Sequence, residues 1–128
     1  MIVDTSALVA IANLEQGHEL LLEKLRAADL VAVGAPTLSE SAIVLQARFG
    51  GAGQRWLLGF VERGAVEVIA FERPHWLEAA EAWGRYGRGR HPAALNFGDC
   101  LSYATAKIAA RPLLCVGDDF AATDIAIA

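Results

Sequence analysis

Met1-Ile2-Val3-Asp4-Thr5-Ser6-Ala7-Leu8 opens the chain and gives the first indication of its architecture. The apolar residues before Asp4 predict a short buried strand that ends at this acid. Thr5 or Ser6 can then cap a helix through Asn13, because a side-chain hydroxyl accepts a hydrogen bond from an unpaired backbone amide. A strand that passes directly into a helix is typical of an α/β domain.

The rest of the chain continues this alternation of strands and helices. We expect further strands at Leu30–Val33, Val66–Ala70, Leu113–Val116 and Ile125–Ile127, and helices at His18–Ala28, Pro36–Phe49, Gln54–Arg63, Pro74–Tyr86 and Gly98–Ala110. Such an order predicts a parallel sheet with right-handed crossovers. No repeat or linker divides the 128 residues, so we predict one domain, 1–128, with a mostly parallel sheet of four to five strands.

Composition indicates a folded protein with apolar surface to cover. Hydrophobic residues make up 55% of the chain and charged residues 20%, which argues against disorder. The mean hydropathy of +0.36 is high, and it indicates a sheet buried on both faces, a partner on an apolar patch, or both. No apolar run approaches the roughly 20 residues of a membrane span, and the first residues do not resemble a signal peptide. We therefore expect a cytoplasmic protein with no membrane contact.

Charge and cysteine content narrow the possible functions. The net charge of −4 argues against nucleic-acid binding by bulk charge. It remains compatible with a cluster of acids that holds a divalent cation, since the cation supplies local positive charge. Cys100 and Cys115 are too few for a zinc ribbon or a disulfide framework, and we expect two buried free thiols.

Several acids follow the predicted strands. Asp4 ends the first strand, and Asp118 and Asp119 follow the fourth. Glu40 lies in the first turn of the helix after the second strand. Asp99 opens the helix that leads to the fourth, so topology alone constrains its place less than that of the other acids. Sites in open parallel sheets form outside the carboxyl ends of the strands, so we expect these carboxylates to meet there.

Each acid by itself also has a purely structural explanation. Asp4 can be a helix cap, Glu40 can complete a capping box with Thr37, and Asp99 can stabilise a helix N-terminus. One of the two acids after the fourth strand can cap the following short helix. Three or four carboxylates in one place repel each other, however, and a divalent cation relieves that repulsion. Mg²⁺ or Mn²⁺ suits carboxylate and water ligands, whereas the scattered histidines do not indicate zinc.

Motifs along nearly the whole chain resemble one known family. They are Met1 to Leu8, Ser39-Glu40-Ser41, Ala47-Arg48-Phe49-Gly50, Tyr86 to Pro92, Leu95-Asn96-Phe97-Gly98-Asp99-Cys100, Pro112-Leu113-Leu114, Gly117 to Phe120 and Thr123-Asp124-Ile125. In this order they resemble the PIN-domain ribonucleases, and more closely the VapC-type toxins of toxin–antitoxin pairs.

This resemblance implies a three-layer α/β/α fold and a site of four acids. It implies a Mg²⁺- or Mn²⁺-dependent endoribonuclease that hydrolyses RNA through a metal-activated water and leaves 3′-hydroxyl and 5′-phosphate ends. A cognate antitoxin and a homodimer are the implied partners. The implied site comprises Asp4, Glu40 and Asp99, with Asp4 and Asp99 as metal ligands, a fourth acid that we place at Asp118, then Asp119, with Asp124 as a further candidate, and the small polar residues Thr5, Ser6 and Asn96.

Two further regions invite a functional interpretation. Arg85, Arg88 and Arg90 precede the helix of Asp99, and we expect them to contact RNA, because arginine binds phosphate in a bidentate manner. A solvated loop with ion pairs is the alternative. Trp76 and Trp83 lie seven residues apart on one face of a predicted helix, which favours core packing. Helices such as the one carrying Trp56, Leu57 and Phe60 carry the antitoxin groove and dimer surface in the family, and we expect interface surface there.

Other functional classes fit less well. A phosphotransfer enzyme with Asp4 as nucleophile would resemble the haloacid dehalogenases, but Ser6 stands where they have a second Asp. A receiver domain needs a Lys after a late strand, and none follows Leu113–Val116. A non-catalytic PIN-like binding module would be expected to lose acids, yet all positions are filled. A flap-type DNA nuclease needs clamping elements for which 128 residues leave little room.

Overall fold

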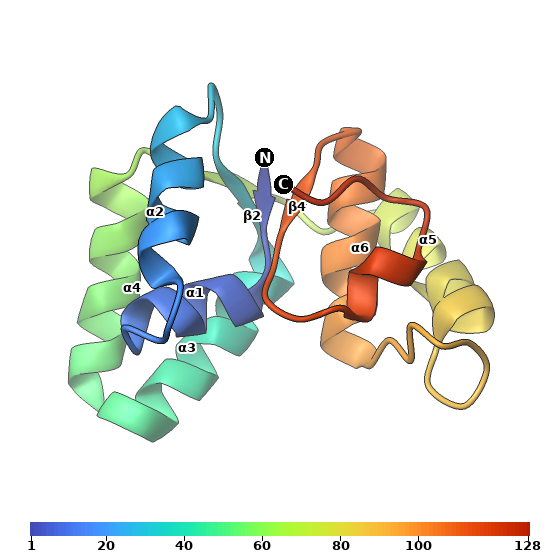
Figure 1. Cartoon of the computed structure of the whole chain (residues 1–128), viewed down its shortest axis with the longest axis horizontal. Coiled ribbons are helices and arrows are strands. Elements are labelled where there is room, and N and C mark those ends of the chain that lie inside the picture. The colour runs from blue at the N-terminus through green and yellow to red at the C-terminus, as the bar shows by residue number, and fades with distance from the viewer.

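A four-stranded parallel sheet forms the centre of the protein, in the order β3-β2-β1-β4 (Figure 1). The computed structural model describes residues 1–128. Its strands are β1 (Ile2–Val3), β2 (Ala32–Gly34), β3 (Glu67–Ile69) and β4 (Leu113–Leu114). Ile2 pairs with Ala32 on one side and with Leu113 on the other. The predicted parallel sheet is thus confirmed, whereas the predicted last strand is reduced to a single parallel bridge between Ile127 and Leu113.

Helices cover both faces of this sheet. They are α1 (Thr5–Ala12), α2 (His18–Ala27), α3 (Ala35–Phe49), α4 (Gly51–Arg63), α5 (Arg73–Tyr86), α6 (Phe97–Ala109) and the 3-10 turn η1 (Asp119–Ala122). Figure 1 shows α1 to α4 on one side of the sheet and α5 and α6 on the other. Neighbouring residues of a strand point to opposite faces, so Ile2 packs in the α5–α6 core and Val3 in the α1–α4 core. The three-layer arrangement is confirmed.

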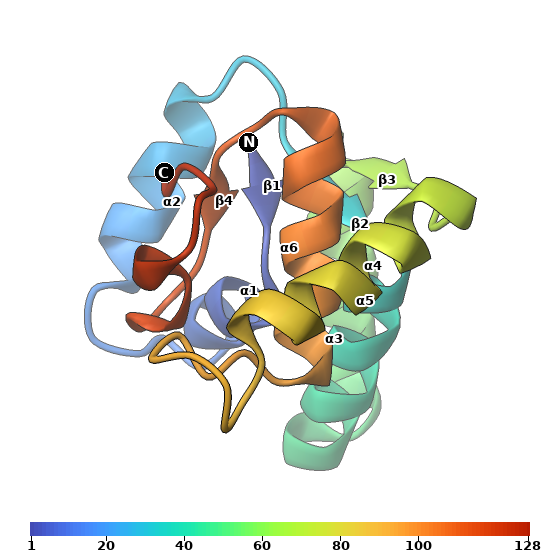
Figure 2. The ribbon, with the colours of Figure 1, turned by 90° about the vertical axis from the view of Figure 1, so that its right-hand side faces the viewer.

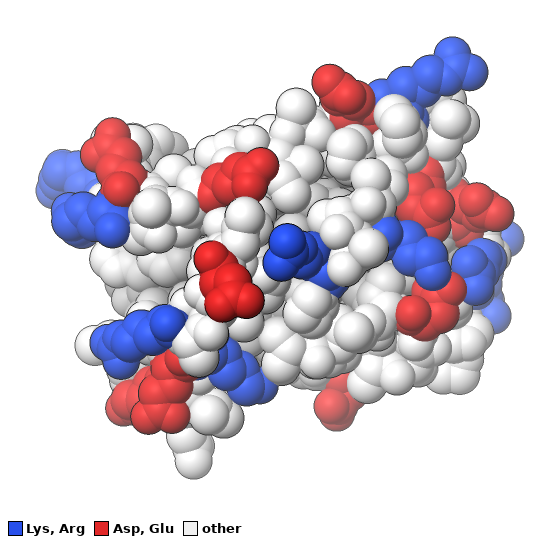
Figure 3. Space-filling view, turned by 90° about the horizontal axis from the view of Figure 1, so that it is seen from above, with Lys and Arg blue, Asp and Glu red and all other residues white.

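The carboxyl ends of the strands meet at one edge. Figure 2 shows β1 passing into α1 at this edge, where α6 also begins. α3 starts directly after β2, and the segment after β4 arrives at the same place. On the face seen in Figure 3, acidic and basic side chains are interspersed among uncharged surface, with no patch of a single sign.

Two predicted helix caps are wrong. α1 begins directly at Thr5, so Asp4 is its N-cap in place of Thr5 or Ser6. α3 begins at Ala35 with Gly34 as N-cap, because proline is tolerated in a first turn whose amides have no helical partner. Glu40 is then the sixth residue of α3, and its carboxylate bonds elsewhere rather than completing a capping box.

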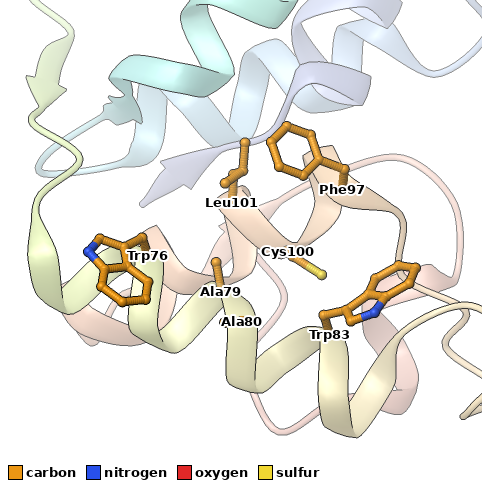
Figure 4. A pocket seen from close by; sticks show the side chains of 7 residues that line it. All are labelled: Trp76, Ala79, Ala80, Trp83, Phe97, Cys100 and Leu101. Atoms are coloured by element: carbon orange, nitrogen blue, oxygen red, sulfur yellow. The ribbon is translucent and has the colours of Figure 1, made fainter.

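The predicted core position of Trp76 and Trp83 is also wrong, since 53% and 41% of their surfaces are exposed. The buried stripe of α5 is instead His75, Ala79, Ala82 and Tyr86, one residue before each tryptophan. Figure 4 shows the two indoles beside an apolar groove between α5 and α6 that Ala79, Ala80, Phe97, Cys100 and Leu101 complete. This groove is unfilled surface, and it accounts for part of the high mean hydropathy.

Two further expectations concern thiols and membranes. Both cysteines are free, but only Cys100 is buried, and Cys115 is half-buried. None of the helices combines the length and the apolar run that a membrane span requires.

Candidate active site

Asp4 is held at the centre of the edge where the strands end. Only 4% of its surface is exposed, and its backbone amide donates to the Leu114 carbonyl of β4 at 2.9 Å. Its Oδ2 accepts hydrogen bonds from the Ser6 amide at 2.9 Å and from Ser6 Oγ at 2.6 Å. Ser6 Oγ in turn accepts from the Val116 amide at 3.0 Å. Both bonds to the carboxylate use Oδ2, so Oδ1 stays available to a ligand.

Glu40 reaches the same place from α3. Its Oε2 accepts a hydrogen bond from Thr5 Oγ1 at 2.8 Å, which links α3 to the start of α1. Ser41 Oγ donates to the Thr37 carbonyl at 2.7 Å and approaches Thr5 Oγ1 at 3.3 Å. The threonine that the sequence placed among supporting residues therefore orients the Glu40 carboxylate directly.

Gly98 makes room for this carboxylate. A Cβ atom at position 98 would lie 2.6 Å from Glu40 Oε1 and 2.8 Å from Oε2, closer than real contacts allow. The sequence interpretation named Gly98 only as part of a motif and missed this function. The signal in the sequence was a glycine within a predicted helix, where alanine would be more stable. A neighbouring group that needs the space explains such a glycine.

Asp99 begins α6 in a reciprocal cap with Asn96. Asn96 Oδ1 accepts from the Asp99 amide at 3.0 Å, and Asp99 Oδ2 accepts from the Asn96 amide at 2.7 Å. Burial raises the pKa of Asp99 from 3.8 to about 6, the bond from the Asn96 amide opposes this shift, and the charges of Asp4, Asp119 and Glu40 add to it. The structural explanation of Asp99 is thus confirmed, and the cap also orients its carboxylate within range of the charges of three other acids.

The acid after β4 that enters this site is Asp119. Asp119 lines the cavity of the other acids and acts on the pKa of Asp99. Asp118, which the sequence favoured, is outside the lining, and the turn before it contains Gly117 with a positive φ of 95°. The preference for Asp118 is therefore corrected to Asp119.

Asp124 lies in a different cluster altogether. Its carboxylate accepts from Tyr103 Oη at 2.5 Å and from Lys107 Nζ at 2.7 Å, and it pairs with Arg85 at 3.4 Å. The Lys107 and Tyr103 hydrogen bonds hold the pKa of Asp124 well below its usual range. Asp124 is thereby committed to tying the C-terminal segment to α6 and α5, and its candidacy as a fourth acid is wrong.

The acids line a cavity of about 370 Å³. Its walls are Asp4, Thr5, Ser6, Val9, Glu15, Glu40, Arg48, Asn96, Asp99, Val116 and Asp119. Carboxylate, hydroxyl and amide oxygens are the donors that hard divalent cations prefer, so this donor set fits Mg²⁺ or Mn²⁺. No three acids already surround one point as a closed ligand set.

Comparison with known families identifies the family of the whole chain. The PIN domain family matches residues 1–126 of the chain. The chain belongs to the PIN-domain family. Two relatives of this PIN protein are ribonuclease VapC36 of Mycobacterium tuberculosis, 44% identical over 98% of the chain and 91% of the relative, and ribonuclease VapC of Mycolicibacterium smegmatis, 42% identical over 98% of each. These relatives confirm the VapC-type resemblance.

Solved structures share the PIN fold over almost the full chain. Mycobacterium tuberculosis VapC20, described as a toxin that cleaves the sarcin-ricin loop, superimposes with a TM-score of 0.81 at 18% identity, covering 99% of this chain and 97% of that one. VapBC2 of Rickettsia felis, bound to a DNA fragment from its promoter, gives a TM-score of 0.76 at 18% identity, covering 99% and 96%. At this identity the likeness concerns the fold.

The three arginines of the basic loop differ in their freedom in this PIN domain. Arg85 is held within the protein, because it donates to Tyr86 Oη at 2.7 Å, lies over the Tyr86 ring and pairs with Asp124. Arg88 and Arg90 are exposed on the loop between α5 and α6, whose ends are joined by a bridge between Gly87 and Leu95. Only these two are free to meet a ligand without breaking an existing contact.

Proposed function

We propose that this PIN-domain protein is a metal-dependent endoribonuclease and the toxin of a VapC-type toxin–antitoxin pair. The observation that carries the proposal is the single cavity in which Asp4, Glu40, Asp99 and Asp119 meet at the carboxyl edge of the sheet. The relatives named as VapC ribonucleases support RNA as the substrate.

Asp4 and Asp99 are the residues that would hold the cation, which we propose to be Mg²⁺ or Mn²⁺. Both are fixed by hydrogen bonds before any ligand arrives, Asp4 by Ser6 and Asp99 by Asn96. When bound, the cation makes a water more acidic and offsets negative charge that develops on the phosphate. The raised pKa of Asp99 supports this assignment, since a cation would relieve the repulsion behind part of the shift.

We assign the role of general base to Glu40. The hydrogen bond from Thr5 holds Oε2, and both carboxylate oxygens lie close to the α6 turn at Gly98. A carboxylate fixed in this way can orient an attacking water and accept its proton. Neither cysteine is a rival nucleophile, because burial raises the pKa of Cys100 and of Cys115 to about 11, which keeps both thiols neutral.

RNA and protein partners would use different surfaces. Arg88 and Arg90 would contact the RNA backbone beside the cavity, while Arg85 contributes to the fold. For the antitoxin we propose the groove between α1, α2 and α4. Its lining includes the apolar side chains of Leu14, Leu22, Trp56 and Phe60 and the basic side chains of Arg26 and Arg63. For a homodimer we propose the apolar groove of Trp76 and Trp83. We expect the protein to act in the cytoplasm, where its RNA is found.

Cleavage of a single-stranded RNA with Mg²⁺ tests the function. We expect cleavage that stops with EDTA and returns with added Mg²⁺, and products with 3′-hydroxyl and 5′-phosphate ends. Asp4→Asn and Asp99→Asn should abolish cleavage while the circular dichroism spectrum stays that of the folded protein. A folded Asp99→Asn protein with full activity, or products with 2′,3′-cyclic phosphates, would contradict the proposal.

A further inference from the structure

Arg48 is the one basic side chain among the residues that line the acidic cavity. It lies on the last turns of α3, eight residues after Glu40, which is roughly 12 Å along the helix axis. Glu15, which lies three residues beyond the end of α1, lines the same end. The cavity therefore has an acidic end at the first turns of α1 and α6 and a basic group at the far end of α3.

The contact that Arg48 makes within the protein is weak. Arg48 Nη1 lies 3.8 Å from Glu15 Oε1, and the two side chains are 50% and 45% exposed. The same Glu15 oxygen already accepts a hydrogen bond from Asn13 Nδ2 at 2.8 Å. Exposed pairs of this kind contribute about 0–1 kcal/mol, and a cation in the last turn of a helix adds a similarly small stabilisation, so neither interaction holds the guanidinium firmly in place.

Arg48 also leaves the four acids unpaired. Its single ion pair is with Glu15, so the guanidinium neither neutralises the acidic end nor blocks it. A cation that stands beside an acidic site with most of its donors free is suited to an anionic ligand. The planar guanidinium binds a phosphate through two parallel hydrogen bonds.

We propose that Arg48 binds a backbone phosphate of the RNA next to the phosphate that is cleaved, and thereby sets the register of the strand in the cavity. This inference rests on the proposed ribonuclease function. Arg48 and Glu40 are separated by roughly 12 Å along the axis of α3, which favours a contact with a neighbouring phosphate over one with the cleaved phosphate. Glu15 competes with that phosphate for the guanidinium, so RNA binding exchanges a weak internal pair for a stronger bidentate one.

The first test compares variants by steady-state cleavage of a labelled single-stranded RNA with Mg²⁺. Arg48→Ala should raise KM about tenfold with kcat nearly unchanged, Arg48→Lys should lie between, and Glu15→Gln should lower KM severalfold. Arg48→Ala should also reduce the salt slope of log KM by about 0.7, the contribution of one phosphate contact in a single strand. Arg73→Ala, at the start of α5 and outside the cavity, is the matched control and should leave KM unchanged.

The second test removes the charge from the RNA instead of the protein. Neutral methylphosphonate linkages are placed singly along the substrate on both sides of the cleaved bond. One position should raise KM of the wild type about tenfold and have no further effect on Arg48→Ala. Melting temperatures check that each variant is folded. If Arg48→Ala does not fold, Arg48→Lys and Glu15→Gln still test the inference.

The outcomes distinguish a failure of the proposed ribonuclease function from a failure of the proposed phosphate contact of Arg48. A wild-type protein that does not cut RNA with Mg²⁺ contradicts the ribonuclease function itself. A cutting wild type whose KM is unmoved by Arg48→Ala, or equal costs of every methylphosphonate in both proteins, overturns the inference alone. A loss of kcat with KM unchanged also overturns it, because Arg48 would then act on the cleaved phosphate.

Discussion

Gly98→Ala should separate activity from stability in this protein, because the added methyl group meets a functional carboxylate rather than the core. The new Cβ would lie 2.6 Å from Glu40 Oε1, whereas ordinary contact begins at 3.4 Å. The carboxylate must therefore retreat by about 0.8 Å, the difference between these two distances. Its side chain is flexible, so the movement costs little energy, but it strains or breaks the hydrogen bond from Thr5.

The two effects of this substitution have opposite signs. Alanine is favoured over glycine within a helix by about 1 kcal/mol, so we expect the melting temperature to stay equal or to rise by up to about 4 °C. A displacement near 1 Å in an active site costs about 10²-fold in rate. We therefore expect kcat/KM for RNA cleavage to fall about 10- to 100-fold in a protein that is no less stable.

Gly84→Ala is the matched control for this prediction. Gly84 lies in α5, and a Cβ there would have no heavy atom within 4 Å. This variant should gain similar stability and keep wild-type cleavage. Thermal melting and cleavage rates of both proteins, measured in one buffer, decide the matter. A Gly98→Ala protein with wild-type activity would show that Glu40 either does not move or does not matter.

Three other perturbations test the site and its surroundings. Asp119→Asn should lower kcat/KM at least tenfold, and Asp118→Asn should not. Similar values of kcat/KM for the two variants would contradict the choice of Asp119 as the fourth acid. Without divalent cations at pH 7, Asp99→Asn should be more stable than wild type by roughly 1–3 kcal/mol, because a pKa raised from 3.8 to about 6 weakens the native state as pH rises through that window. At pH 4 the difference in stability should vanish. Equal denaturant midpoints of the two proteins at pH 7 would contradict this prediction. Asp124→Asn should lower the melting temperature by roughly 3 °C at pH 7 through the lost ion pair with Lys107. Since the native pKa of Asp124 is lowered, this difference in melting temperature should shrink below about pH 4. A difference that stays constant with pH would indicate lost packing instead.

Local patterns in the sequence determined the class of fold and the centre of the site. The apolar run before Asp4 and the alternation of strands and helices predicted a parallel sheet, whose topology requires strand ends to meet at one edge. The position of Asp4 could be predicted because it ends a strand at this edge, whereas Asp99 opens a helix and was assigned to the site through the resemblance to the PIN-domain ribonucleases. The position of a residue that ends a strand depends on the order of strands and helices along the chain, and that order follows from the sequence.

Only the tertiary structure decided what depends on the direction of a side chain. Asp118 and Asp119 are adjacent in sequence, and the turn after β4 places only Asp119 in the lining of the cavity. Trp76 lies one residue beyond a buried stripe, a rotation of about 100° that periodicity could not resolve. Contacts between distant segments, such as Gly98 with Glu40 and Arg48 with the cavity, arise from packing, so no local pattern in the chain carried them.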